Sequence, residues 1–238
     1  MTSTLETRWL GRVGFAEALT RQDELVRSKR ADPDAPDELW LLEHDPVYTI
    51  GRTPDQSSLR GAAHLPHPLV AINRGGQATY HGPGQLVGYF LLDLRRYGQD
   101  LHRYLRWIET FLIELLASYE INATARAGLT GVWVEQRKVA SIGVGVRHWI
   151  TMHGFALNVN GDLSAFDAIT PCGIADVTMT SIEKETGVIL PLESVAAQTA
   201  RLASESIAQL PGSARASRAG FGAPPKPSLA TPRHNPDF

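Results

Sequence analysis

The sequence predicts an α+β fold in which helices flank a sheet of mostly antiparallel or mixed strands. Residues 14–30 and the segment after Asp100 have the apolar spacing of amphipathic helices. Residues 131–159 hold three short apolar runs separated by turn residues, which is typical of hairpin strands. Because helices mix with antiparallel strands, we expect the α+β class.

The first half of the chain alternates between one helix and several short strands. The helix at 14–30 places its apolar residues and one glutamine near one face: Phe15, Ala18, Leu19, Gln22, Leu25 and Val26. A turn-rich break follows at 32–37. Residues 39–43 read as a buried strand, which His44-Asp45-Pro46 interrupts before it resumes at 47–50. A short strand at 70–72 leads into a glycine-rich segment at 74–84, and the next strand is expected at 86–94.

The second half begins with the most regular helix pattern in the chain. Asp100 is suited to cap a helix whose apolar stripe runs from Leu101 to Tyr119. Strands are expected at 131–135, 138–146 and 151–159, with a turn at 136–137, and a last helix at 191–209. We expect residues 1–210 to form a single catalytic domain and the proline-rich tail at 211–238 to be disordered.

Composition narrows the class of protein. Apolar residues make up 43% of the 238 residues, enough for a sizeable core. The net charge of −2 argues against a sequence-independent nucleic-acid binder, which needs a basic face. No apolar run is long enough for a membrane span or a signal peptide. With one cysteine no internal disulfide can form, and a cytoplasmic protein is expected.

The glycine-rich segment is the first candidate for a binding site. Between two apolar strands it reads Arg-Gly-Gly-Gln-Ala-Thr-Tyr-His-Gly-Pro-Gly-Gln over residues 74–85. Glycines let the backbone approach a ligand closely, and the polar residues among them favour a site over an ordinary glycine-rich turn. The spacing of a P-loop is absent.

Lys138 and Cys172 are candidate chemical groups. Lys138 opens a strand and shares the parity of Ala140 and Ile142, so it is expected beside a buried face unless a bulge breaks the alternation. The plain alternative is a strand-end lysine that reaches water. A lone cysteine is more often an inert core residue than a nucleophile, but Cys172 lies between Pro171 and Gly173, which place it on a turn and favour exposure of the thiol. A nearby ammonium would favour the thiolate.

The strand at 151–159 adds two polar residues. His153 is a possible supporting group of the site, and Asn158 is suited to be a buried amide that fixes a loop. His64 and His67 form a pair without matching ligands nearby, so no metal site is expected. The absence of a Gly-x-Ser-x-Gly elbow argues against a serine hydrolase.

These segments together resemble the lipoyl (octanoyl) transferase family of the lipoate-protein ligase B type. The similar segments are residues 45–52, 74–85, 131–134, 138–143, 153–159 and 171–174. They span about residues 40–185, and the 74–85 and Pro-Cys-Gly-Ile strings are specific. The tail lies outside the resemblance.

The resemblance implies a fold shared with biotin and lipoate ligases and a catalytic dyad of Cys172 and Lys138. It implies octanoyl transfer from octanoyl-acyl carrier protein, through a Cys172 thioester, to a lysine of lipoyl domains of 2-oxo acid dehydrogenases or of the glycine-cleavage H protein. No cofactor is expected, because a thioester can form the amide without ATP. The implied acyl site comprises Arg74, Gly75, Gly76, Gln77, Ala78, Thr79, Tyr80, His81, Ser141, Ile142, Gly143, Gly154, Phe155 and Ala156.

Three other functions stay open from the sequence. An ATP-dependent lipoate or biotin ligase of the same fold would need no nucleophilic cysteine. A non-catalytic acyl- or lipoyl-domain-binding module would use Cys172 only for packing. An octanoyl amidotransferase would move the chain between lipoyl-bearing proteins by a related cysteine mechanism.

Overall fold

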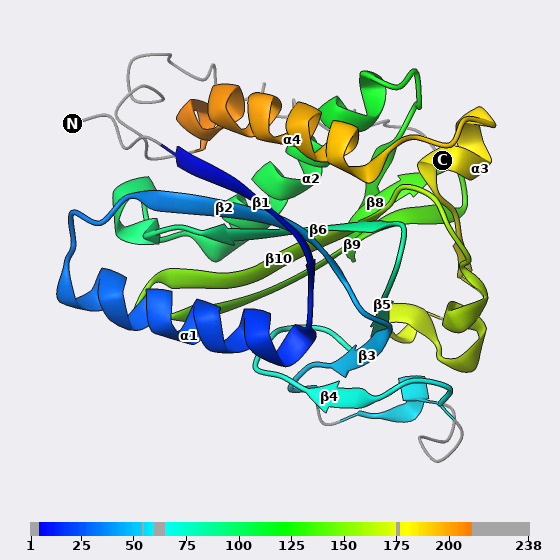
Figure 1. Ribbon diagram of the computed structural model, residues 1–238, viewed down its shortest axis with the longest axis horizontal. Helices are drawn as coiled ribbons and strands as arrows, with labels where there is room; N and C mark the ends of the chain where they lie inside the picture. Colours follow the sequence, from blue (N-terminus) through cyan, green and yellow to red (C-terminus); the bar gives the residue numbers. More distant parts are fainter. Residues whose placement is uncertain (1–4, 54, 60–64, 175–176, 211–238) are drawn as a thin grey trace, which may run out of the picture.

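The computed structural model describes residues 5–53, 55–59, 65–174 and 177–210, and within them an eight-stranded sheet forms the centre (Figure 1). Its strand order is β1-β2-β6-β10-β9-β8-β7, and β11 pairs with β9. A smaller sheet has the order β4-β3-β5. The strands are β1 (Leu5–Val13), β2 (Asp37–His44), β3 (Val47–Ile50), β4 (Leu69–Ala71), β5 (Thr79–His81), β6 (Gln85–Leu91), β7 (Thr124–Arg126), β8 (Leu129–Val134), β9 (Arg137–Arg147), β10 (Ile150–Asn158) and β11 (Thr178–Met179).

Helices cover both faces of the large sheet (Figure 1). Helices α2 (Leu101–Ala117) and α4 (Leu192–Ser206) lie on one face, and α1 (Phe15–Ala31) lies on the other, on the side of the small sheet. A short helix α3 (Ile182–Thr186) precedes α4, and 3₁₀ turns occur at Ser57–Leu59, Leu94–Tyr97, Ser164–Ala168, Pro171–Gly173 and Ile207–Gln209. No helix that the structure describes has the length and apolarity to cross a bilayer.

The core explains why the central strands read as continuous apolar runs. Strands β6 and β10 are buried along their whole length, because helices or the small sheet cover both faces. The apolar stripe of α2 enters the largest core cluster with Phe111, Leu112 and Leu115. Ala18 of α1 belongs to a second cluster on the opposite face.

The predicted α+β class with a mixed sheet is confirmed, and several boundaries differ. Most pairs are antiparallel, but β1 with β2, β3 with β4 and β9 with β11 are parallel. The strand expected at 86–94 ends at Leu91 because the chain turns into a 3₁₀ helix. His44 ends β2 instead of interrupting it, and β3 then joins the small sheet.

Strands β1, β5, β7 and β11 and helix α3 are absent from the sequence-based prediction. β1 is an edge strand whose exposed or half-exposed positions carry Glu6, Arg8 and Arg12, so it lacks a strong apolar signal. The others span two to five residues, too few for a periodic pattern. The predicted tail at 211–238 lies outside the described residues.

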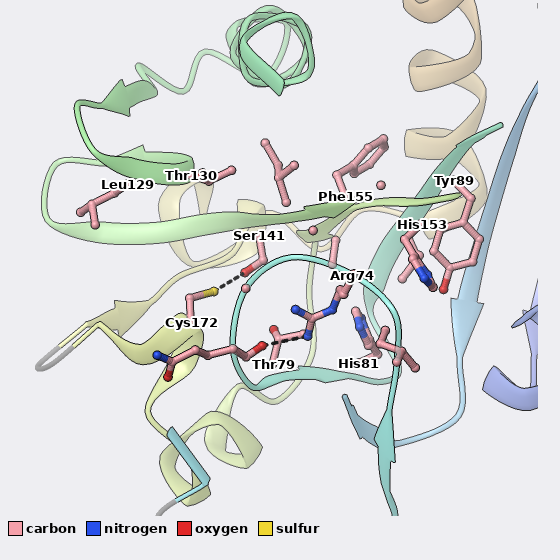
Figure 2. Close-up of a pocket in the computed structure, with 18 of the residues that line it drawn as sticks. Arg74, Thr79, His81, Tyr89, Leu129, Thr130, Ser141, His153, Phe155 and Cys172 are labelled. Atoms are coloured by element: carbon pink, nitrogen blue, oxygen red, sulfur yellow. Dashed lines mark hydrogen bonds between the residues drawn. The ribbon is translucent and has the colours of Figure 1, made fainter. Parts of the chain in front are cut away.

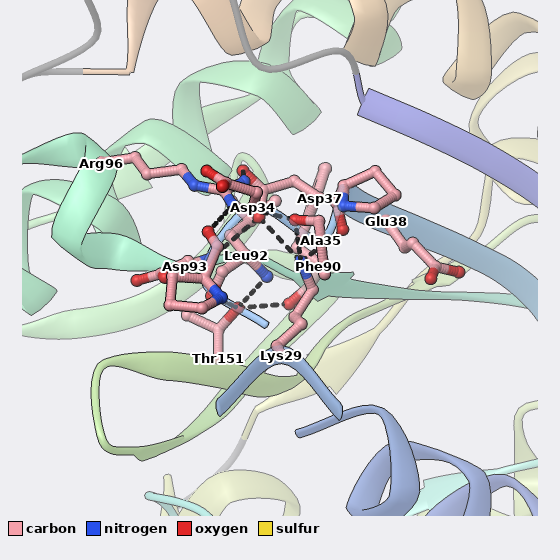
Figure 3. Close-up of polar contacts among 12 residues, drawn as sticks. Lys29, Asp34, Ala35, Asp37, Glu38, Phe90, Leu92, Asp93, Arg96 and Thr151 are labelled. Atoms are coloured by element: carbon pink, nitrogen blue, oxygen red, sulfur yellow. Dashed lines mark hydrogen bonds and ion pairs between the residues drawn. The ribbon is translucent and has the colours of Figure 1, made fainter. Parts of the chain in front are cut away.

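A buried polar cluster joins α1 to the sheet (Figure 3). The Asp37 carboxylate accepts hydrogen bonds from Lys29 Nζ at 3.1 Å, from the Asp93 N–H at 2.9 Å and from the Tyr97 hydroxyl at 2.9 Å. Arg96 forms an ion pair with the same carboxylate at 3.2 Å. Asp37 and Lys29 are almost fully buried. The cluster therefore fixes the end of α1 against β2 and the turn after β6.

Candidate active site

The structure brings Lys138 and Cys172 into direct contact. Lys138 Nζ lies 3.1 Å from Cys172 Sγ, although the two residues come from β9 and from the 3₁₀ turn Pro171–Gly173. Lys138 is fully buried, and its ammonium also donates to the Thr130 carbonyl at 3.1 Å. The Trp133 ring centroid lies 5.3 Å from Nζ, within cation–π range. A buried ammonium beside a thiol is the arrangement that favours a thiolate.

Lys138 reaches Cys172 because a bulge interrupts the alternation of β9. Val132 pairs with Ala140, but Trp133 pairs with Lys138, so one extra residue stands in β9 at Val139. Val139 and Ala140 both enter the apolar core. Lys138 therefore leaves the face of Ala140, and like Ser141 it contacts Cys172. The simple parity that placed Lys138 with Ala140 and Ile142 is wrong for this reason.

Cys172 is held in a strained turn that is tied to the small sheet. Its φ of 56° lies in the left-handed region, which is costly for a residue with a side chain. The Cys172 N–H donates to the Ala78 carbonyl at 2.9 Å, and the Thr170 N–H donates to the Ser58 carbonyl at 2.7 Å. These bonds fix the half-buried thiol at the wall of a cavity.

The surroundings of Cys172 lower the pKa of its thiol. Burial alone raises this pKa, because the thiolate loses water. The charge and the hydrogen bond of Lys138 lower it, and the Ser141 hydroxyl and the charge of Arg74 lower it further. The lowering effects exceed that of burial, so the net pKa lies below the ordinary value. No carboxylate in the described ranges forms an ion pair with Lys138, and its ammonium contacts the Cys172 sulfur instead.

Arg74 supplies a second buried cation. Its guanidinium donates to the Thr49 carbonyl at 3.1 Å, to the Thr49 hydroxyl at 2.9 Å, and to the carbonyls of Gly75 and Gln77 at 2.9 Å each. Burial lowers the pKa of Arg74 and the Cys172 sulfur opposes this, but an arginine stays charged in proteins. Figure 2 shows the side chain between Cys172 and the histidines at the far end of the cavity.

Glycines of β9 make room for this loop. A Cβ at Gly143 would lie 2.9 Å from Arg74 Cδ, and one at Gly145 would lie 2.5 Å from the Asn73 carbonyl oxygen. The Gly75 N–H donates to the Val144 carbonyl at 3.1 Å, so the loop lies directly on the strand. The glycines therefore mark a close backbone approach.

The glycine-rich loop at 74–81 and strands β9 and β10 line a cavity of about 210 Å³. Most of the residues assigned to the site by resemblance line it: Arg74, Gly76, Gln77, Thr79, His81, Ser141, Ile142, Gly143, Gly154, Phe155, Ala156 and Cys172, together with His153 (Figure 2). Gly75, Ala78 and Tyr80 do not. Ala78 and Tyr80 point into the apolar core of the small sheet. None of the residues lining this cavity is an aspartate or glutamate, so Arg74 meets no carboxylate among them.

Histidines form the far end of the cavity (Figure 2). Burial, with the charges of Arg74 and Arg147, lowers the pKa of His153 to about 4. Burial and the neighbouring His44 lower the pKa of His81 to about 3, although the hydrogen bond to Gln85 opposes this. Both rings are therefore neutral near pH 7. His153 Nε2 and Thr79 Oγ1 are buried without a protein partner in the described structure.

Asn158 and His67 have structural roles. The Asn158 amide donates to the Thr180 carbonyl at 2.9 Å and accepts from Gln85 at 3.0 Å, so it fixes the loop after Cys172, as predicted. His67 stacks on Tyr48, and His64 lies outside the described residues. Within those residues no group of three histidine, cysteine or acidic side chains could hold a metal ion.

Several cavity residues were missed by sequence reasoning: Phe15, Ile72, Val87, Tyr89, Gly128, Leu129, Thr130 and Ile174. Val87 and Tyr89 alternate on β6 and so share one face, a signal that the uniformly apolar strand concealed. The rest come from separate elements, and no local pattern brings them together.

Solved structures of other proteins share this fold. A solved structure of lipoate-protein ligase A bound with ATP has a TM-score of 0.67 and 15% identity, covering 87% of this chain and 86% of that one. Biotin protein ligase from Aquifex aeolicus in complex with biotin and ATP has a TM-score of 0.55 and 16% identity, covering 86% and 71%. The expected biotin/lipoate ligase-like fold is confirmed.

A curated relative in sequence is "Octanoyltransferase" of Geotalea uraniireducens. It is 52% identical over 178 residues, which are 75% of this chain and 81% of the relative. Another, from Geobacter sulfurreducens, is 47% identical over 206 residues, or 85% of this chain and 86% of the relative. The model of the lipoyl protein ligase A/B catalytic domain matches residues 15–202. The chain therefore belongs to the lipoyl protein ligase A/B catalytic-domain family.

Proposed function

We propose that this protein transfers an octanoyl group from octanoyl-acyl carrier protein to a lysine of a lipoyl domain, through a thioester on Cys172. The observation that carries the proposal is the 3.1 Å contact between Lys138 Nζ and Cys172 Sγ at the wall of the cavity. Relatives named octanoyltransferase support the choice of acyl group. Acceptors of this kind include lipoyl domains of 2-oxo acid dehydrogenases and the glycine-cleavage H protein.

In the first step the Cys172 thiolate attacks the carbonyl carbon of the carrier's thioester. A tetrahedral oxyanion forms, the new S–C bond to Cys172 is kept, and the carrier's thiolate leaves. One thioester replaces another, so the step is nearly balanced in free energy. The step needs the thiolate, because the thiol is a weak nucleophile. The lowered pKa of Cys172 increases the fraction of thiolate.

In the second step the acceptor lysine must attack as a neutral amine. When Cys172 is acylated, the Lys138 ammonium gives its proton to the departing carrier thiolate, so Lys138 is neutral when the acceptor amine arrives. Lys138 then takes a proton from the attacking amine, and the Cys172 thiolate leaves as the amide forms. Conversion of a thioester to an amide is downhill, so ATP is not required.

Cationic and N–H donors support the oxyanions of both steps. The buried Arg74 guanidinium gives the cavity positive charge. Among the glycine N–H groups of the loop and of the Cys172 turn, the Gly75 N–H donates to the Val144 carbonyl and the Gly173 N–H donates to the Thr170 carbonyl. The Gly76 N–H has no acceptor among the described residues, which makes it the better candidate donor.

The cavity suits a slender chain. Its volume of about 210 Å³ is below the roughly 300–1,000 Å³ of pockets for drug-sized ligands. Ile142, Phe155, Ala156 and Val87 give it apolar walls, and each buried methylene contributes about 0.8 kcal/mol. These features favour an octanoyl group over a bulkier acyl-adenylate. A catalytic thiol must also stay reduced, which favours the cytoplasm as its compartment.

The test is intact-protein mass spectrometry after incubation with octanoyl-acyl carrier protein and no acceptor. We expect one octanoyl adduct that hydroxylamine removes, and none in Cys172→Ser. Addition of a lipoyl domain should then clear the adduct and leave a stable amide on the acceptor. Full transfer activity in Cys172→Ser would contradict the covalent mechanism.

The same assay separates the alternative functions. Transfer from free octanoate that depends on ATP would identify a ligase, and a stoichiometric complex without turnover would identify a binding module. An octanoylated lipoyl protein that serves as a better donor than the carrier protein would identify an amidotransferase.

A further inference from the structure

A buried carboxylate on α2 has no role in the steps above. Glu109 has a side chain only 2% exposed, within the otherwise apolar face that α2 turns to the sheet. A buried carboxylate is costly unless its oxygens are paired. One oxygen pairs with Arg106, whose side chain is half exposed. The other accepts a hydrogen bond from the Gly131 N–H at 3.1 Å, in strand β8 beside the strand that carries Lys138.

The peptide group that Glu109 contacts also contacts Lys138. The Gly131 N–H and the Thr130 carbonyl belong to one planar peptide unit and point in opposite directions. Glu109 Oε1 accepts from the N–H side at 3.1 Å, and Lys138 Nζ donates to the carbonyl side at 3.1 Å. The carboxylate, the peptide and the ammonium therefore form a continuous chain that ends at Cys172. Each bond polarises the next one.

The backbone at this peptide is fitted to the lysine. Gly131 has a φ of 133°, which residues with a side chain rarely adopt. A Cβ there would lie 2.6 Å from Lys138 Cε, so the lysine stem runs against bare backbone. A rotation of the Thr130–Gly131 peptide would turn its carbonyl away from Nζ and leave the ammonium one acceptor short.

We propose that Glu109 is a positioning residue for Lys138, which it orients through the Thr130–Gly131 peptide. The carboxylate holds the N–H, the carbonyl is thereby aimed at Nζ, and the ammonium is kept against Sγ. This rests on the proposed function, in which Lys138 ionises Cys172. It adds that the acceptor atom of residue 109 sets how far the thiol is ionised.

The variants separate the hydrogen bond from the charge. Glu109→Gln keeps an acceptor oxygen for the Gly131 N–H and removes the negative charge. Glu109→Ala removes the acceptor and the charge. Glu109→Leu removes them too but fills the space, and it serves as the second variant if the alanine variant does not fold. Glu114→Ala is the matched control, because Glu114 lies exposed on the same helix. Circular dichroism and thermal melting check that each variant is folded.

The readout is the rate of Cys172 alkylation by iodoacetamide as a function of pH, which needs no acyl substrate. We expect Glu109→Gln and Glu114→Ala to keep the wild-type midpoint. Glu109→Ala or Glu109→Leu should raise the midpoint by about one pH unit, which lowers the rate below the midpoint about tenfold. The octanoyl transfer rate should fall by a similar factor, with rescue in Glu109→Gln.

Two results would overturn the positioning role. One is a wild-type midpoint in the folded alanine or leucine variant. The other is an equal shift in Glu109→Gln and Glu109→Ala, which would assign the effect to charge and not to the hydrogen bond. Failure of the proposed function looks different, because replacement of Lys138 itself would then leave the alkylation profile unchanged.

Discussion

The substitution Lys138→Met tests whether the ammonium ionises the thiol. Methionine keeps an unbranched stem of similar length, so the narrow space beside Gly131 stays filled. The change removes one charge 3.1 Å from Cys172 Sγ. Burial of the thiol, which raises its pKa, stays in place. The thiol of the variant should therefore ionise only well above its present pKa.

The size of the shift follows from the distance. Two unit charges 3.1 Å apart attract by about 1.3 kcal/mol in water and about 5 kcal/mol at an effective dielectric constant of about 20. Cys172 is half-buried, so the value for this pair lies between these limits. Since about 1.4 kcal/mol corresponds to one pKa unit, the thiol pKa should rise by about 1 to 4 units.

The assay is the iodoacetamide alkylation rate from pH 5 to 10, with Lys184→Met as control. Lys184 is exposed on α3, so its loss should leave the midpoint where it is. A midpoint in Lys138→Met within about half a unit of the control would refute the Coulomb argument, since even the value for water predicts about one unit.

Three further predictions concern the loop, the fold and the histidines. Gly143→Ala should push Arg74 from its place and lower octanoyl transfer about tenfold or more in steady-state assays, with little change in thermal stability. Asp37→Ala leaves the buried Lys29 ammonium unpaired and should lower the free energy of unfolding by about 3–5 kcal/mol in urea titrations. The pKa of folded His153, about 4, is below its ordinary 6.5, so the unfolded chain binds more protons between these values. The free energy of unfolding should therefore fall as pH drops from 6.5 towards 4, by at most about 1.4 kcal/mol per pH unit for this residue. In His153→Gln it should fall less steeply, and equal slopes in the two proteins would refute this contribution of His153.

Local patterns predicted most of the secondary structure. The apolar stripe after Asp100 gave α2 within two residues of its ends, because a helix that covers a sheet must present such a stripe. Edge strand β1 was not predicted because its exposed positions are charged, and residues at the edge of a sheet need not be apolar. Apolar periodicity also does not predict β-bulges, and the bulge at Val139 places Lys138 on the opposite face of β9 from the one expected.

The site was predictable only in part for a different reason. Cys172 and Lys138 stand 34 residues apart, and it was the family resemblance, not their spacing, that paired them. Glu109 sits inside an apolar helical stripe, where a single carboxylate reads as an exception without a partner. Besides Arg106 its partner is a backbone N–H of β8, and such backbone contacts leave no trace in side-chain patterns.

The segment around Cys172 is anchored at both ends to different sheets. Before the cysteine, Thr170 is bonded to Ser58 beside the small sheet, and after it Thr178 pairs with Arg137 of the large sheet. A displacement of the small sheet relative to the large one would change the distance between Lys138 Nζ and Cys172 Sγ, and widening it to about 6 Å would halve the attraction. The ionisation of the sulfur thus depends on how the two sheets pack against each other.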